Sequence, residues 1–204
     1  MLEFFKQLTD PQSIIQYGGL ALLLFVVFAE TGLLIGFFLP GDNLIFLSGI
    51  ICVLKPELLG VNLLELITLL CLAAILGNCV GYAFGYKVGP AMFEKKDSLI
   101  FRKRHLELTK AYYEKNGGKT LIFGRFVPII RTFAPIFAGI VKVDFRMFMV
   151  YNIVGAIAWI GTLGSLGYYL GTYTWVQENL RLIFISLIII TLIPLVIPYL
   201  KRKK

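Results

Sequence analysis

The chain has 204 residues, 58% of them hydrophobic, and a mean hydropathy of +0.81. The length fits one domain, and the apolar content exceeds what a soluble fold needs, so the sequence indicates a membrane protein with several spans. The formal net charge is +8, but much of it flanks apolar segments, at residues 94–119 and 201–204. The positive-inside rule accounts for this charge, and no nucleic-acid partner is expected.

Residues 1–29 are expected to form an N-terminal helix that stays in the mature protein. A spanning helix needs about 20 apolar residues, which this stretch provides together with its continuation. The N-terminus lacks a basic region, and no small-residue cleavage site follows the apolar stretch, unlike a removable signal peptide.

Residues 30–54 form the first of two apolar segments that are broken by charges. Glu30 begins the segment, and Pro40-Gly41 followed by Asp42 interrupts it. Charged side chains at membrane depth are costly and usually face a cavity on a transport path. We expect a re-entrant hairpin with Pro40 and Gly41 as its hinge and Glu30 as a group that exchanges protons. Asp42 has two open interpretations, a second acid of the site or the N-cap of the returning helix.

Residues 62–89 are predicted to form a transmembrane helix. Its glycines recur every four residues, at positions 77, 81, 85 and 89. Such a row lets another helix approach the backbone closely, so these glycines indicate helix packing. Asn78 is expected to support the site by satisfying the broken backbone of a neighbouring hairpin.

Residues 94–118 are predicted to form an amphipathic helix on the cytoplasmic side, near the lipid headgroups. Its basic excess is compatible with recruitment of anionic lipid or with a solvated connecting helix. The only histidine, His105, lies here, away from the charges of the broken segments, which argues against a phosphatase with a histidine nucleophile. The sequence has no nucleotide-binding loop and no spacing of metal ligands, so we expect no enzyme, no cofactor and no metal site.

Residues 119–141 form the second broken segment, which carries Arg125 and Arg131 with Pro128 between them and Pro135 beyond. Residues six apart lie on different faces of a regular helix, whereas a hairpin broken by proline lets two guanidinium groups converge. Arginine binds phosphate oxygens in a bidentate fashion and stays charged when desolvated. The segment therefore predicts a phosphate clamp with Pro128 and Pro135 as hinges.

The same arginines have a structural alternative. They could balance Glu30 and Asp42 in a buried salt-bridge network, and a resting arginine–carboxylate pair could open when phosphate arrives.

Positive charge decides the topology of the second half. If 119–141 crossed the membrane completely, Lys142, Arg146 and the basic tail at 201–204 would lie outside, against the positive-inside rule. If it dips in and returns, all three lie in the cytoplasm, with transmembrane helices at 145–171 and 180–200. The sequence thus predicts an all-α polytopic membrane protein with about four transmembrane helices, two oppositely oriented re-entrant hairpins and both termini in the cytoplasm.

The motifs resemble those of the DedA family, also described as the SNARE-associated or VTT-domain superfamily. Four blocks carry the resemblance: Glu30 with Leu39-Pro40-Gly41-Asp42; Gly77-Asn78 with Gly81-Tyr82 and Gly85; residues 124–128 with Arg131, Pro135, Ala138 and Gly139; and Asn152, Gly155 and Trp159 with Gly167-Tyr168. The family often has Glu where this chain has Asp42, and Asp where it has Asn78.

The resemblance implies a flippase for lipid phosphates in the bacterial inner membrane. The substrate it suggests is undecaprenyl phosphate, recycled from the outer to the cytoplasmic leaflet with a link to proton motive force. Carried over by motif, Arg125 and Arg131 would bind the headgroup, and Glu30 and Asp42 would form the acidic pair. The residues leave open a nonselective phospholipid scramblase, a proton or cation antiporter with structural arginines, and a homo-oligomeric state.

Overall fold

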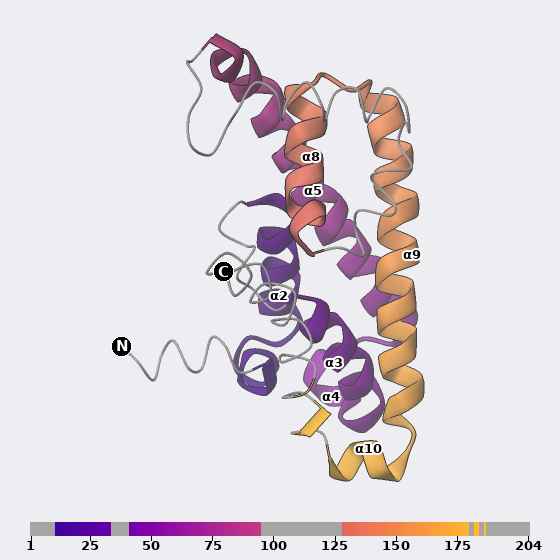
Figure 1. Ribbon diagram of the computed structural model, residues 1–204. Helices are drawn as coiled ribbons and strands as arrows, with labels where there is room; N and C mark the ends of the chain where they lie inside the picture. Colours follow the sequence, from indigo (N-terminus) through magenta and orange to yellow (C-terminus); the bar gives the residue numbers. More distant parts are fainter. Residues whose placement is uncertain (1–10, 34–40, 95–127, 180–181, 184–185, 187–204) are drawn as a thin grey trace, which may run out of the picture. The chain divides into compact units, whose positions relative to one another are not determined.

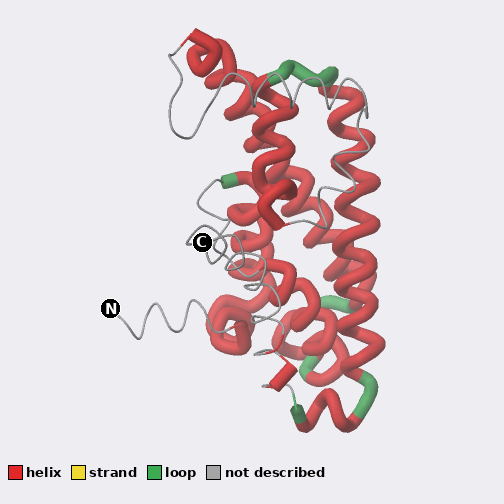
Figure 2. Tube along the Cα trace, viewed as in Figure 1, coloured by secondary structure: helices red, strands yellow, loops and turns green. Residues whose placement is uncertain are grey.

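The computed structural model describes residues 11–33, 41–94, 128–179, 182–183 and 186 (Figure 1). Within these ranges all regular structure is helical, which confirms the predicted all-α class for this part of the chain (Figure 2). The helices are α2 (Pro11–Gly32), α3 (Gly41–Leu54), α4 (Pro56–Leu59), α5 (Leu63–Glu94), α8 (Pro128–Ile140), α9 (Phe145–Gly171) and α10 (Thr174–Glu178).

Two stretches of helix are long and apolar enough to cross a membrane, judged by length and composition over the described residues. They are Pro56–Val88 and Phe145–Gly171. Both agree with predicted transmembrane helices, and α9 has the predicted bounds. The predicted helices at 94–118 and 180–200 lie almost entirely outside the described residues, as do the tail at 201–204 and parts of both broken segments. The re-entrant form and the number of spans therefore stay predictions.

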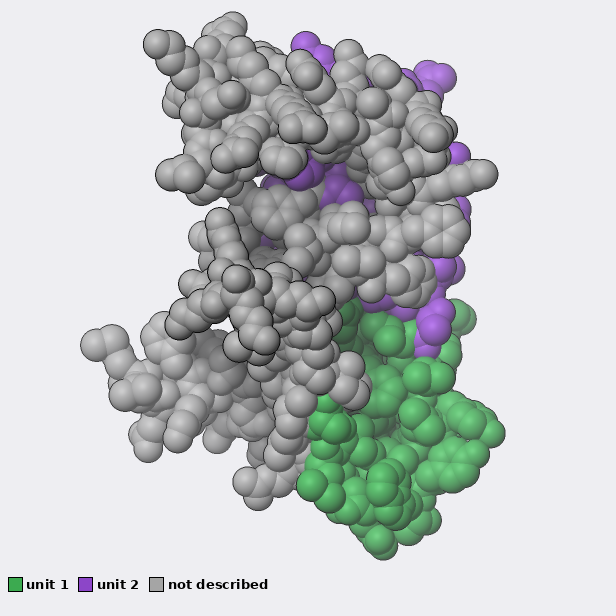
Figure 3. Space-filling model, in the orientation of Figure 1, with its two compact units in different colours: residues 1–23, 40–66, 163–204 green, residues 24–39, 67–162 purple. Residues whose placement is uncertain are grey.

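The chain divides into two compact units (Figure 3). The first consists of residues 1–23, 40–66 and 163–204, and the second consists of residues 24–39 and 67–162. We refer to them as unit 1 and unit 2 and describe each by itself.

In unit 2, α8 packs along α5 through glycine (Figure 1). A Cβ atom on Gly85 of α5 would lie 2.0 Å from the carbonyl oxygen of Ile136, and one on Gly139 of α8 would lie 2.1 Å from that of Tyr82. No side chain fits at such distances, so the two backbones are in direct contact. The core between them contains Tyr82, Ala134, Ala138 and Phe148.

The predicted role of the α5 glycines is confirmed at Gly77 and Gly85. A Cβ on Gly77 would lie 2.6 Å from the carbonyl oxygen of Phe28, at the end of α2. At Gly81 the nearest atoms would be 3.5 Å away, an ordinary van der Waals distance. The surroundings of Gly89 lie outside the described side chains.

In unit 1, α3 packs on the C-terminal part of α9 in the same manner. A Cβ on Gly49 of α3 would lie 2.3 Å from the carbonyl oxygen of Gly164, and one on Gly167 of α9 would lie 2.1 Å from that of Phe46. Almost every residue of α3 is buried.

The contact between short and long helix is thus repeated, once within each unit. The short helices α3 and α8 have 14 and 13 residues; α3 begins directly after Pro40, and α8 begins at Pro128 and contains Pro135. Each of the four helices contributes one glycine and one carbonyl, and the carbonyl lies three residues before the glycine. The positions are 82 and 85 on α5, 136 and 139 on α8, 46 and 49 on α3, and 164 and 167 on α9. The sequence Gly-Tyr-x-x-Gly occurs at both long-helix contacts, at 85–89 and 167–171. The two units thus use the same kind of helix contact, at glycines three residues from a contacted carbonyl.

Candidate functional site

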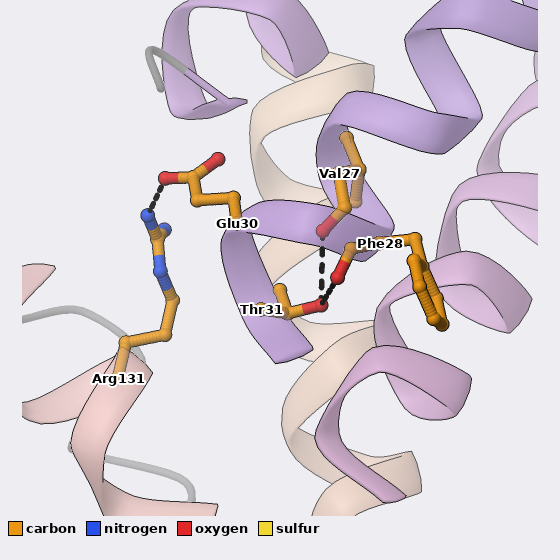
Figure 4. Close-up of polar contacts among 5 residues, drawn as sticks. All are labelled: Val27, Phe28, Glu30, Thr31 and Arg131. Atoms are coloured by element: carbon orange, nitrogen blue, oxygen red, sulfur yellow. Dashed lines mark hydrogen bonds and ion pairs between the residues drawn. The ribbon is translucent and has the colours of Figure 1, made fainter. Parts of the chain in front are cut away.

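A buried ion pair joins the two broken segments. The Nη2 group of Arg131 donates a hydrogen bond to Oε1 of Glu30 (Figure 4). The two side chains are only 3% and 4% exposed. Among the predicted site residues, the structure brings these two together, as in the interpretation of a resting arginine–carboxylate pair.

Glu30 lies in the last turn of α2, which continues beyond the expected end at residue 29 to Gly32. The helix is interrupted earlier, at Gly19, whose φ of 53° lies in the left-handed region that glycine adopts without steric cost. The hydroxyl of Thr31 donates to the carbonyl oxygens of Val27 and Phe28 at 2.9 and 3.2 Å (Figure 4). Thr31 therefore bonds its own helix, while Glu30 points toward Arg131.

Arg131 lies in the first turn of α8, which begins at Pro128. Proline is favoured at the start of a helix because the first backbone N–H groups have no partner within the helix. The helix runs through Pro135, which therefore does not end it.

Trp159 of α9 also contacts the Arg131 guanidinium. The Cζ atom lies 4.5 Å from the centroid of the indole ring, and Trp159 is 2% exposed. A cation over the face of an indole is stabilised by the negative charge of that face, more so when both are desolvated. The guanidinium thus lies between a carboxylate and an aromatic face. Trp159 belongs to the fourth block of the family resemblance, but the sequence carries no signal of its contact with Arg131.

Two buried amides connect α5 and α9 in the same unit. Asn78 Nδ2 donates to Asn152 Oδ1 at 2.8 Å, and Asn152 Nδ2 donates to the carbonyl oxygen of Ile75 at 3.2 Å. The expected role of Asn78, to satisfy the broken backbone of a neighbouring hairpin, stays a prediction beside this contact with Asn152. These hydrogen bonds fix α9 relative to α5 at Asn152. Trp159 lies two turns further along α9, so the same bonds help to position its ring.

Comparison with known proteins identifies the family. The family model described as VTT domain matches residues 39–169. Protein DedA of Escherichia coli strain K12 is 41% identical over 184 residues, which cover 90% of this chain and 83% of the relative. The chain belongs to the DedA family of VTT-domain membrane proteins.

Other relatives of this DedA-family protein are also named as membrane proteins. Uncharacterized membrane protein Rv0364 of Mycobacterium tuberculosis is 38% identical over 84% of this chain and 74% of its own length. Inner membrane protein YqjA of Escherichia coli is 32% identical over 82% of this chain and 73% of its own length. No solved structure matches.

One further charged site residue of the DedA-family motifs, Asp42, lies among the described residues. Asp42 lies in unit 1, in the first turn of α3, one residue after the helix begins at Gly41. A carboxylate there interacts favourably with the helix dipole, although Asp42 is not the N-cap residue. Arg125 and Pro40 lie outside the described residues. The two-arginine clamp and the acidic pair therefore stay predictions.

Proposed function

We propose that this chain is a flippase that carries a lipid phosphate headgroup across the membrane while the lipid tail stays in the bilayer. The observation that supports it most directly is the buried Glu30–Arg131 pair beside Trp159. Membership of a family of membrane proteins is consistent with a transport role. We propose the bacterial inner membrane as its location, with several spans and both termini in the cytoplasm.

As a purely structural element, the Glu30–Arg131 pair would contribute little net stability, because burying two charges costs free energy. Moving each ion out of water costs several kcal/mol, and apolar residues of similar volume often stabilise a fold as well as a buried ion pair does. Ionisable residues within membrane segments are accordingly most often functional. A guanidinium that binds a carboxylate can exchange it for phosphate oxygens, which it can bind in a bidentate geometry.

Proton coupling follows from this competition. Phosphate and the Glu30 carboxylate compete for Arg131, and protonation of Glu30 removes the competitor. At an acidic outer face, Glu30 would take up a proton and Arg131 would bind the headgroup. At the cytoplasmic face, loss of the proton would restore the ion pair and expel the phosphate. The scheme gives transport from the outer to the cytoplasmic leaflet, driven by the proton gradient.

The remaining parts of the scheme come from the sequence. Arg125 would complete the phosphate clamp, and Asp42 would act as the second acid. Pro40 and Gly41 would form the hinge of one broken segment, and Pro128 and Pro135 that of the other (all six belong to the motifs quoted above). Undecaprenyl phosphate is the proposed substrate, and no cofactor or catalytic step is required.

The test is transport in reconstituted vesicles. A fluorescent polyprenyl phosphate is added to the outer leaflet, and its protection from a membrane-impermeant quencher is followed with and without a pH gradient. Arg131→Ala and Glu30→Gln should abolish gradient-driven transport. Arg146→Ala is the matched control, because it removes an exposed guanidinium from the first turn of α9 and should leave transport unchanged.

Three outcomes would overturn the proposal. Unchanged transport in Arg131→Ala would exclude the role of the buried arginine in headgroup binding. Equal movement of ordinary glycerophospholipids without a gradient would indicate a scramblase. Proton or cation flux in vesicles that lack polyprenyl phosphate would indicate an antiporter.

A further inference from the structure

A pocket of about 670 Å³ lies in unit 2, where the end of α5 meets the turn between α8 and α9. Its lining includes aromatic rings, two ammonium groups and one carboxylate, from Tyr82, Tyr86, Phe145, Lys87, Lys142 and Asp144. All of these residues except Tyr82 are exposed. Glu30, Arg131 and Trp159 are not part of the lining, so this pocket is distinct from the proposed transport site.

The pocket lies at the boundary of two membrane spans. One span ends at Val88, next to Lys87, and the other begins at Phe145. Tyrosine is enriched at the membrane–water interface, and lysine near a helix end extends its ammonium group toward the headgroups. The lining therefore faces the level of the membrane at which lipid phosphates lie.

The wall of the pocket is held in place by contacts within the protein. The hydroxyl of Tyr82 donates to the carbonyl oxygen of Val143 at 2.6 Å, which fastens α5 to the turn after α8. The Tyr82 ring stacks on Phe148 with 4.6 Å between centroids and lies 5.5 Å from Phe145. A wall that is ordered before a ligand arrives lowers the entropic cost of binding.

Lys142 occupies a backbone position that normally belongs to glycine. The end of α8 forms a Schellman motif, in which Val143 N–H donates to Ala138 at 2.9 Å and Lys142 N–H donates to Gly139 at 3.0 Å. Lys142 itself has a φ of 53°, a left-handed conformation that is strained for a residue with a Cβ. Glycine would close the same turn without strain, so the lysine is unfavourable for the fold and suited to a role of its side chain.

The charges of the pocket favour an anion. Lys142 Nζ lies over the ring of Tyr86, 5.6 Å from its centroid, and Lys87 contributes the second ammonium group. The carboxylate of Asp144 accepts a hydrogen bond from the Met147 N–H at 2.9 Å, so it is engaged at the N-terminus of α9. Two lysines and one carboxylate leave the lining with a net positive charge, and the aromatic wall gives a ligand an apolar surface.

We propose that this pocket binds the headgroup of an anionic glycerophospholipid from the surrounding membrane. The phosphodiester lies between Lys87 on α5 and Lys142 on the turn after α8, and the glycerol and upper acyl chain contact the aromatic wall. The bound lipid bridges the end of α5 and the α8–α9 turn. This inference does not depend on the proposed transport activity.

The test is native mass spectrometry of the purified protein with equal amounts of phosphatidylglycerol and phosphatidylcholine. Each lysine near a membrane surface contributes about fivefold to anionic lipid binding, so Lys142→Gly should lower phosphatidylglycerol binding about fivefold and Lys87→Gln/Lys142→Gly about 25-fold. Lys142→Arg should retain binding. Lys55→Gln is the control, because it removes an exposed lysine from unit 1.

A thermal unfolding measurement separates lipid binding from folding. Without phosphatidylglycerol, Lys142→Gly should melt at or above the temperature of the natural chain, since glycine relieves the strained turn. Unchanged selectivity in the double variant, or an equal loss in Lys55→Gln, would overturn the assignment. Inorganic phosphate is added as a competitor, with sodium chloride of equal ionic strength as the control. If phosphate displaces the lipid and sodium chloride does not, the pocket is a site for free phosphate, and the assignment is overturned.

Discussion

The energetic coupling between Glu30 and Arg131 can be measured with a double-mutant cycle. Glu30→Gln keeps the size and shape of the side chain and removes its charge, so the buried Arg131 guanidinium loses this carboxylate as a partner. Breaking a buried ion pair by removing one partner typically costs about 3–5 kcal/mol. Trp159 lies against the guanidinium and offsets about 1–2 kcal/mol of this in a desolvated site. We therefore expect Glu30→Gln to lower the free energy of unfolding by about 2–3 kcal/mol.

The second arm of the cycle is Arg131→Gln. It leaves the Glu30 carboxylate buried, and a carboxylate has no favourable interaction with the face of an indole, so the cost should be about 3–5 kcal/mol. The double variant contains two neutral amides that can bond one another, and it should be within about 1–2 kcal/mol of the natural chain. These values give a coupling energy of about 4–6 kcal/mol between the two side chains.

The assay is denaturant-induced unfolding in a defined detergent, followed by circular dichroism for the natural chain and the three variants. A coupling below about 1 kcal/mol is what solvent-exposed ion pairs give. That result would refute the view that the pair is desolvated, and with it the argument that the protein needs a functional reason to keep the pair. A cycle in which the double variant is the least stable of the four would refute it as well.

Three further predictions concern the surroundings of the pair. Trp159→Leu should weaken headgroup binding by Arg131 about threefold to tenfold, which is the effect of losing a cation–π contact. Trp159→Phe should retain most of the binding. Lipid-phosphate binding to the purified protein measures both variants. Gly85→Ala should destabilise the protein by about 1–3 kcal/mol, because a Cβ there overlaps a backbone oxygen of α8, whereas the control Gly161→Ala meets no atom within 4 Å and should be neutral or stabilising in the same unfolding assay. Pro135→Ala should raise the stability of α8, since alanine restores the backbone N–H that proline lacks. The stiffer helix should hold Arg131 more firmly and slow lipid transport in vesicles.

The long apolar helices were the part of the fold that sequence could predict. The span at 145–171 has the bounds of α9, because a long apolar run whose single charge, Arg146, lies in its first turn leaves few alternatives. The glycines of α5 were correctly assigned to close packing at Gly77 and Gly85, since small residues at a spacing of four mark one face of a helix. The sequence could not indicate which helix approaches each glycine, because glycine has no side chain that would discriminate between partners.

The site was predictable in its charges and not in its contacts. Glu30 and Arg131 stood out because charge is rare in apolar sequence, and their pairing was one of the interpretations left open. The contact of Trp159 with Arg131 depends on how α8 and α9 pack, and residues 28 apart in sequence carry no local signal of it. Asn78 and Asn152 are a similar case, since an amide can bond backbone or side chain equally well.

The packing of unit 2 indicates which part of the site would move during transport. Glu30 is held close to α5, because Gly32, two residues later, is so near Gly77 that a Cβ would lie 2.6 Å from its carbonyl oxygen. Backbone-to-backbone contact of α8 with α5 is found beyond Pro135, at Ile136 and Gly139. Arg131 lies on the other side of Pro135, where proline removes one hydrogen bond of the helix. We therefore expect the pair to separate by movement of the first turns of α8 about Pro135, while α2 and the rest of α8 stay on α5. A headgroup that replaces Glu30 would then travel with Arg131, and the carboxylate would stay behind to receive the proton.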